Sequence, residues 1–181
     1  MLHLLVRPRS WAASLGDRQF GSATVTIALA DELVAVFTRD GALVTYRDLD
    51  AQGISRRELW EAAAGAAIAA TATKRGSAFL IRRAVPESAS ALEVAVPAGT
   101  VAAWLGHPRC FTTLHRHLEQ FVPNARYFLA SDRLLLAASA DDPALATIRR
   151  LASEGPLPYE MRYQYGYPAC RALSPVYSRS R

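Results

Sequence analysis

The residues best suited to catalysis or to metal binding lie in one short window of this chain, residues 107–117. Three of its four histidines and one of its two cysteines fall there. Side chains three, four or seven residues apart share one face of a helix, so His107, Cys110 and His117 converge if the window is helical. His115 lies two residues from His117 and points to nearly the opposite side. His107, Cys110 and His117 are therefore the candidate reactive or metal-binding set.

Two kinds of chemistry would use this set. Imidazole and thiolate groups are ligands that zinc prefers, but a tetrahedral site needs four, and Cys170 would have to arrive from the C-terminal segment. A histidine beside a cysteine also lowers the pKa of the thiol, as a small hydrolase with a cysteine nucleophile requires. The alternative is surface histidines and a buried thiol, because Cys110 before Phe111 is typical of core packing. We favour this alternative and assign no catalytic residue and no metal, and the absence of Walker and GxGxxG loops leads us to expect no cofactor.

The C-terminal segment holds the second unusual feature, because five of the seven tyrosines lie between Tyr159 and Tyr177. If residues 162–167 form a strand, alternate side chains put three tyrosines on one face and an arginine and a glutamine on the other. Such a surface would bind a peptide or stack on single-stranded nucleic acid. The alternative is a sheet face packed against a helix. The candidate binding residues are Arg162, Tyr163, Tyr165, Tyr167 and Arg171.

The net charge of +5 arises largely at the C-terminal end, where residues 147–181 contain six arginines against two glutamates. Basic residues gathered on one face give a protein electrostatic affinity for nucleic acid. A nucleic-acid-binding protein would here use Arg149, Arg150, Arg162 and Arg171. The alternative is an ordinary solvated surface, since all basic residues but one are arginine, which indicates a coding bias as much as phosphate binding.

Length and composition predict one domain over residues 1–181. This length and 51% hydrophobic residues suffice for one core, and are too few for two comfortable domains. We expect residues 1–20 to be loosely attached, although Leu2–Val6 is typical of a short strand, and residues 156–181 to form an extended, aromatic and basic tail. No stretch approaches the roughly 20 apolar residues of a membrane helix, and the N-terminus lacks the order of a secretory signal. With two cysteines and no disulfide framework, we expect a cytoplasmic protein without membrane contact.

Local signals predict about three helices. Ser55 and Glu58 form a capping box, which marks a helix start. Pro108 suits the first position of a helix that carries the histidine window. Asp142 followed by Pro143 is typical of an N-cap and a first helical residue. The predicted helices run over residues 56–72, 108–122 and 143–153.

The remaining segments predict strands, so the expected fold class is α+β with a mainly antiparallel sheet. They are rich in β-branched and apolar residues and are separated by turn signals, of which Asp40–Gly41 is the clearest hairpin turn. The extended segments are residues 24–29, 33–37, 43–46, 77–81, 92–96, 126–130 and 133–138.

Three segments together resemble YtpQ-like bacterial proteins of unknown function. They are Tyr46–Trp60 with its helix start, the extended pair at Arg126–Ala138, and the terminal Leu173–Tyr177. In that family a "dlea-lGis-eeL" helix start, an extended pair and a closing "LSd-vY" occur in this order. The chain departs from the pattern in the alanine tract after Trp60 and in Pro175, which replaces an acidic residue. The resemblance implies an α+β fold and no assigned activity, so it supplies no catalytic residues.

We therefore expect a non-catalytic binding or interaction protein that recognises a protein partner or a second copy of itself. Three alternatives stay open. The first is nucleic-acid binding through the arginine- and tyrosine-rich C-terminal segment, and the second is a small hydrolase or metal site at His107–His117. The third is an immunity-type protein that neutralises a toxin.

Overall fold

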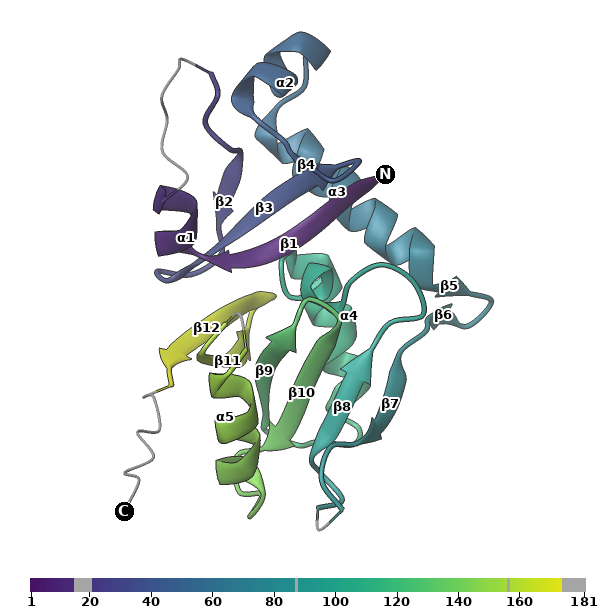
Figure 1. The fold of residues 1–181 in the computed structure, drawn as a ribbon. Coiled ribbons are helices and arrows are strands. Elements are labelled where there is room, and N and C mark those ends of the chain that lie inside the picture. The colour runs from purple at the N-terminus through teal and green to yellow at the C-terminus, as the bar shows by residue number, and fades with distance from the viewer. Residues whose placement is uncertain (15–20, 87, 156, 174–181) are drawn as a thin grey trace.

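A four-stranded antiparallel sheet forms the N-terminal part of the fold (Figure 1). The computed structural model describes residues 1–14, 21–86, 88–155 and 157–173. The strands of this sheet are β1 (Leu2–Pro8), β2 (Thr26–Ala28), β3 (Leu33–Arg39) and β4 (Ala42–Leu43), in the order β1-β3-β2 with β4 also paired to β3. Leu4 and Val6 of β1 are buried in the core, so this part of the segment that we expected to be loosely attached is held firmly.

The turn between β3 and β4 confirms the predicted hairpin. Asp40 and Gly41 have φ angles of 50° and 87°, and positive φ at both central positions is the geometry of a tight hairpin turn. The strand predicted over residues 43–46 was wrong in part: β4 ends at Leu43, Thr45 is extended and forms an isolated bridge with Thr24, and a helix begins at Tyr46. Thr45 caps that helix: its hydroxyl accepts from the Asp48 amide, and the Asp48 carboxylate accepts from the Thr45 amide at 2.7 Å.

Five α-helices and one 3-10 helix occur within the described residues. They are α1 (Arg9–Ser14), α2 (Tyr46–Gln52), α3 (Arg56–Thr71), η1 (Val101–Trp104), α4 (Pro108–Leu118) and α5 (Leu145–Ser153). The Ser55–Glu58 capping box starts α3 as predicted. The predicted N-cap Asp142 was wrong, because α5 begins at Leu145; Asp142 instead accepts from the Ala144 amide at 2.7 Å within the preceding turn.

The second sheet is antiparallel, has six strands and carries a helix on each face (Figure 1). Its strands, in the order β12-β11-β9-β10-β8-β7, are β7 (Leu80–Arg83), β8 (Leu92–Ala95), β9 (Ala125–Ser131), β10 (Leu134–Ser139), β11 (Tyr159–Gln164) and β12 (Tyr167–Ala172). A short hairpin of β5 (Ala72–Thr73) and β6 (Gly76–Ser77) precedes it. Successive strand residues face opposite sides, so Tyr127 packs against Phe111 of α4, whereas Phe128 joins the cluster that includes Ile148 of α5.

One main core contains residues of both sheets, including Leu4 and Tyr127. Gly106 allows the close approach, because a Cβ at this position would overlap Cδ2 of Leu4. A two-pronged ion pair between Arg7 and Asp132, with N–O distances of 2.6 and 2.7 Å, also joins the sheets. The α+β class with mainly antiparallel sheet is thus confirmed. Over the described ranges, no helix combines the length and apolar character needed to cross a bilayer.

Candidate functional site

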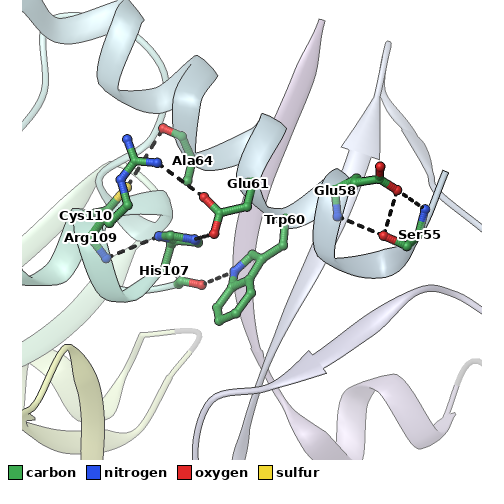
Figure 2. A network of polar contacts seen from close by, with 9 residues as sticks. Ser55, Glu58, Trp60, Glu61, Ala64, His107, Arg109 and Cys110 are labelled. Atoms are coloured by element: carbon green, nitrogen blue, oxygen red, sulfur yellow. Dashed lines mark hydrogen bonds and ion pairs between the residues drawn. The ribbon is translucent and has the colours of Figure 1, made fainter.

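His107 caps the helix that carries the histidine window, as Figure 2 shows. Its Nδ1 accepts from the Arg109 amide at 3.2 Å, and its Nε2 lies 3.5 Å from Oε1 of Glu61. The ring is 3% exposed and meets Trp60 edge-on at 4.6 Å. Burial lowers the pKa of His107, and the nearby Glu61 carboxylate only partly offsets this effect. His107 is therefore a buried capping residue in its neutral form.

The two thiols are poorly suited to nucleophilic attack. Cys110 is fully buried, with Sγ 3.9 Å from the carbonyl oxygen of Ala64 (Figure 2). Burial raises the pKa of Cys110 to about 12 and that of Cys170 also to about 12. A thiolate is the reactive form of cysteine, and at neutral pH both residues remain thiols.

His117 packs against aromatic rings. Its ring lies 5.1 Å from that of Phe79 and 5.8 Å from that of Phe121. In the part of the chain that the structure describes, no group of three His, Cys, Asp or Glu side chains is arranged to hold a metal ion. His107, Cys110 and His117 therefore pack in different surroundings, and the structure gathers none of them into a shared polar site.

His115, which the helical geometry set apart from the candidate set, lies in a polar cluster between α4 and the second sheet. Its Nδ1 is 2.7 Å from the Tyr127 hydroxyl, and its ring stacks on that of Tyr163 with centroids 4.1 Å apart. Its Nε2 lies 3.9 Å from the Glu119 carboxylate. That carboxylate favours the tautomer with the proton on Nε2, in which Nδ1 accepts from Tyr127. Burial lowers the pKa of His115, so the ring is neutral at pH 7.

A polar pocket opens beside this cluster, where β9 and β11 separate. The paired register of the two strands contains Met161 opposite Tyr127 and no further pair. The resulting hollow, which we call the strand-end pocket, has a volume of about 460 Å³. Its lining residues are His115, Glu119, Asn124, Ala125, Arg126, Arg162, Tyr163, Gln164 and Ala169.

Two arginines line the strand-end pocket, and one of them is paired with a carboxylate outside it. Arg126 forms an ion pair with Glu160, with 3.2 Å between Nε and Oε1. Arg162 is exposed and forms no ion pair with any described residue. Glu119 is the only carboxylate among the lining residues, so the two guanidinium groups outnumber it. The pocket can accept an anionic group.

The strand predicted over residues 162–167 was wrong, because the chain reverses in the middle of it. β11 ends at Gln164 and β12 begins at Tyr167; Tyr165 and Gly166 form the turn, with φ angles of 51° and 90°. Glycine supplies the positive φ that a tight turn requires. A Cβ on Gly166 would lie 2.8 Å from Pro108, which places the turn against the start of α4.

This turn separates the tyrosines that we expected on one face. Tyr163 packs on α4, with its ring 5.4 Å from that of Phe111 and its hydroxyl 3.1 Å from that of Thr112. Tyr165 is 89% exposed at the hairpin tip, and Tyr167 is 40% exposed. The packed interpretation thus holds for Tyr163, while Tyr165 presents an aromatic surface to solvent, one residue beyond Gln164 of the strand-end pocket.

The arginines proposed for nucleic-acid binding divide between two hollows. Arg162 lines the strand-end pocket, whereas Arg149, Arg150 and Arg171 line a second hollow beside α5. Arg171 therefore does not share a pocket with Arg162, although both were predicted as binding residues.

Sequence reasoning missed His115, Glu119, Asn124 and Arg126 as members of the site. One signal was present: His115 and Glu119 stand four apart on α4, a spacing that places their side chains together. Arg126 carried no such signal, because its place beside Arg162 depends on the pairing of β9 with β11. Asn124 has φ of 53°, a left-handed conformation that asparagine tolerates better than most residues.

The fold and the site define an α+β protein with a basic polar pocket and an exposed aromatic hairpin tip. Comparison of the chain with protein-family models, with curated proteins and with solved structures finds no match.

Proposed function

We propose that this chain is a non-catalytic binding protein that recognises an acidic segment of a protein partner. The strand-end pocket receives the acidic side chains, and the hairpin tip provides an aromatic contact. The observation that carries the proposal is an arginine in the pocket, Arg162, that has no ion-pair partner among the described residues, and three residues along the chain Tyr165 is 89% exposed.

The chemistry of the pocket suits carboxylates. A guanidinium group presents paired N–H donors that match the two oxygens of a carboxylate. Arg162 and Arg126 both line the pocket, and each follows or precedes one residue of the Met161–Tyr127 pair along its strand. Because Glu160 already pairs with Arg126, Arg162 is the group that would bind a carboxylate of the partner.

The hairpin tip has the properties of an interface anchor. Tyrosine and arginine are enriched among the residues that dominate binding energy at protein interfaces. The Tyr165 side chain can be covered by a partner without rearrangement, because the turn that presents it is fixed by Gly166 and Pro108. A partner that covers Tyr165 and pairs a carboxylate with Arg162 would therefore make both an apolar and a charged contact with this surface.

Several contacts favour binding over catalysis at this site. Nδ1 of His115 is engaged by Tyr127, and Nε2 faces Glu119, so the imidazole forms part of the wall. The thiols of Cys110 and Cys170, with pKa values raised to about 12, supply no nucleophile at neutral pH. An acidic partner is also favoured over a second copy of the chain, because the net charge of +5 repels self-association.

A random-peptide display library, panned against the full chain, tests the proposal while the partner is still unidentified. We expect the enriched peptides to contain aspartate or glutamate. A selected peptide, labelled with fluorescein, would then be titrated by fluorescence polarisation against the wild type and against Arg162→Gln and Tyr165→Ser. Each variant should raise Kd by about tenfold, the effect of losing roughly 1.4 kcal/mol at an interface anchor.

Two control variants show whether a loss of peptide affinity is specific to Arg162 and Tyr165. Arg57→Gln removes an exposed arginine of α3, and Leu80→Ser removes an exposed apolar side chain of β7; both should bind as the wild type does. Enriched peptides without acidic residues would overturn the proposal, as would unchanged affinity in both site variants. Displacement of the peptide by a single-stranded oligonucleotide at equal concentration would reassign the surface to nucleic acid.

We also propose that the chain is a divergent YtpQ-like protein. What supports this is the order of three quoted segments, among which α3 with its Ser55 cap and the β9–β10 pair occupy the expected positions. Most of the terminal segment Leu173–Tyr177 lies outside the described residues. A reducing compartment such as the cytoplasm is the location we propose, because Cys110 and Cys170 are both free.

A further inference from the structure

A second charged hollow, separate from the strand-end pocket, lies between α5 and the β11–β12 hairpin. We call it the α5 pocket; its volume is about 320 Å³. It is lined by Ala146, Arg149, Arg150, Glu160, Arg171, Ala172 and Leu173. Three of these seven residues are arginines and one is a carboxylate, so the lining has a formal excess of two positive charges.

Glu160 is fully engaged by arginines on either side. Its side chain is 9% exposed. Oε2 accepts a hydrogen bond from Nε of Arg149 at 2.8 Å and lies 2.7 Å from Nη2 of Arg149, and Oε1 forms an ion pair with Nε of Arg126 at 3.2 Å. Both carboxylate oxygens are thus occupied, and Glu160 has little capacity left to neutralise another cation.

Arg171 lies next to this carboxylate without pairing to it. It stands directly opposite Glu160 in the register of β11 and β12, so the two side chains share one face of the sheet. Neither Arg171 nor Arg150 forms an ion pair within the described ranges, and both are exposed. The α5 pocket therefore has two guanidinium groups whose charge the described residues leave uncompensated.

We propose that the α5 pocket binds the phosphate group of a small phosphomonoester. At pH 7 such a group carries about −1.5 to −2 charges, which matches the excess of two on the lining. Arginine binds phosphate through paired N–H donors, and here arginines from α5 and β12 converge on one hollow. The alanines and Leu173 offer apolar contacts to the organic part of the ligand.

The same features favour a phosphomonoester over a nucleic-acid strand. Nucleic-acid backbones carry one charge per phosphate along their length, and proteins that track them present an extended basic groove. The arginines of the α5 pocket instead surround a single hollow, which the Arg149–Glu160–Arg126 bridge separates from the strand-end pocket. This site goes beyond the proposed protein-binding function and uses different residues, so either can fail while the other stands.

Isothermal titration calorimetry on the full chain tests the site. The probes are inorganic phosphate, adenosine monophosphate, ribose 5-phosphate and, as matched compounds without phosphate, adenosine and ribose. We expect the three phosphate compounds to bind and the two others not to bind. Arg150→Gln and Arg171→Gln should each weaken binding by about tenfold, as expected for loss of one charge-assisted contact.

Arg57→Gln, which removes an exposed arginine distant in the fold, serves as the matched control and should bind as the wild type does. Because Arg150 and Arg171 are exposed, their variants should keep the wild-type melting temperature, which confirms that they are folded. Absence of phosphate binding, or binding that both variants leave unchanged, would overturn the proposal. A further probe is a single-stranded oligonucleotide that has no terminal phosphate. If it binds more tightly than adenosine monophosphate, and if Arg150→Gln and Arg171→Gln abolish this binding, the proposal is overturned and the arginines are assigned to nucleic acid.

Discussion

Replacement of Glu160 by glutamine should destabilise the fold, because this carboxylate neutralises two arginines on the α5 face of the second sheet. Glu160 forms ion pairs with Arg126 at 3.2 Å and with Arg149 at 2.7 Å, and it accepts a hydrogen bond from Nε of Arg149 at 2.8 Å. Glutamine keeps the size of the side chain but removes the charge, and it replaces one acceptor oxygen with a donor. The two guanidinium groups would then face each other with no anion between them.

The structure sets the size of the effect. Removing one partner of a fully buried ion pair costs about 3–5 kcal/mol. Here the arginines are only partly buried, with side chains 24% exposed for Arg126 and 41% exposed for Arg149, so water recovers part of the loss. We expect a loss of about 2 kcal/mol in the free energy of unfolding, which at this chain length lowers Tm by about 4–8 °C.

Urea denaturation and differential scanning calorimetry measure this loss. Glu154→Gln, which neutralises an exposed carboxylate at the end of α5, is the control and should change the free energy of unfolding by less than about 0.5 kcal/mol. A double-mutant cycle with Arg149→Gln should give a coupling energy of about 1 kcal/mol between Arg149 and Glu160. The reasoning is refuted if Glu160→Gln is as stable as the wild type and the coupling is zero.

Three further predictions concern backbone, protonation and thiols. Gly166→Ala should destabilise the fold by about 1–2 kcal/mol, because φ of Gly166 is 90° and the new Cβ would meet Pro108, whereas Gly65→Ala in the open part of α3 should stabilise it by about 0.5–1 kcal/mol. Urea titrations that change the free energy of unfolding in the same direction for both variants would contradict this. Burial lowers the pKa of His115 below its ordinary 6.5, so as the pH falls the unfolded chain binds a proton before the folded chain does, and the free energy of unfolding should decrease from pH 7 towards pH 5. The decrease should be less steep in His115→Gln, and the same pH dependence in the wild type and the variant would contradict this. Because burial raises the pKa of Cys110 and of Cys170 to about 12, iodoacetamide at pH 7.5 should label them slowly in the folded chain and rapidly in urea; rapid labelling without urea would show that the thiols are accessible.

The parts of the fold that the sequence predicted correctly depend on signals within a few residues. Asp40–Gly41 needs only its own backbone preference to form a turn, and Ser55 with Glu58 closes a capping box inside one helical turn. Thr45 and Asp48 have the same capping spacing, but we assigned residues 43–46 to a strand because they are apolar and β-branched. The cap determined the structure there, and α2 follows it.

The C-terminal hairpin shows where local signals are insufficient. Alternating tyrosines are typical of a strand, and the turn at Tyr165–Gly166 lacks the asparagine or aspartate that usually marks such a hairpin. The turn forms because Gly166 fits against Pro108, a contact across the fold that the sequence order does not reveal. The α4 helix begins at Pro108 as predicted but ends at Leu118, before the predicted end at residue 122, and His115, which lines the strand-end pocket, was not among the predicted candidates.

The strand-end pocket depends on contacts between distant segments. His115, Arg126 and Arg162 meet only because β9 and β11 are neighbours in the second sheet, and the strands that pair were not assigned from the sequence. The predicted candidates Arg162 and Tyr163 do lie in this pocket. The composition of the C-terminal segment therefore indicated part of the pocket lining, while the geometry of the pocket depends on the tertiary structure.

The binding of an acidic segment at the strand-end pocket is tested most directly by a ¹⁵N-HSQC titration of the full chain with the selected acidic peptide. The account predicts saturable shifts in the amides of residues 115–127 and 162–167, and their loss in Arg162→Gln. Shifts confined to the first sheet, or a spectrum that stays unchanged at saturating peptide, would contradict it.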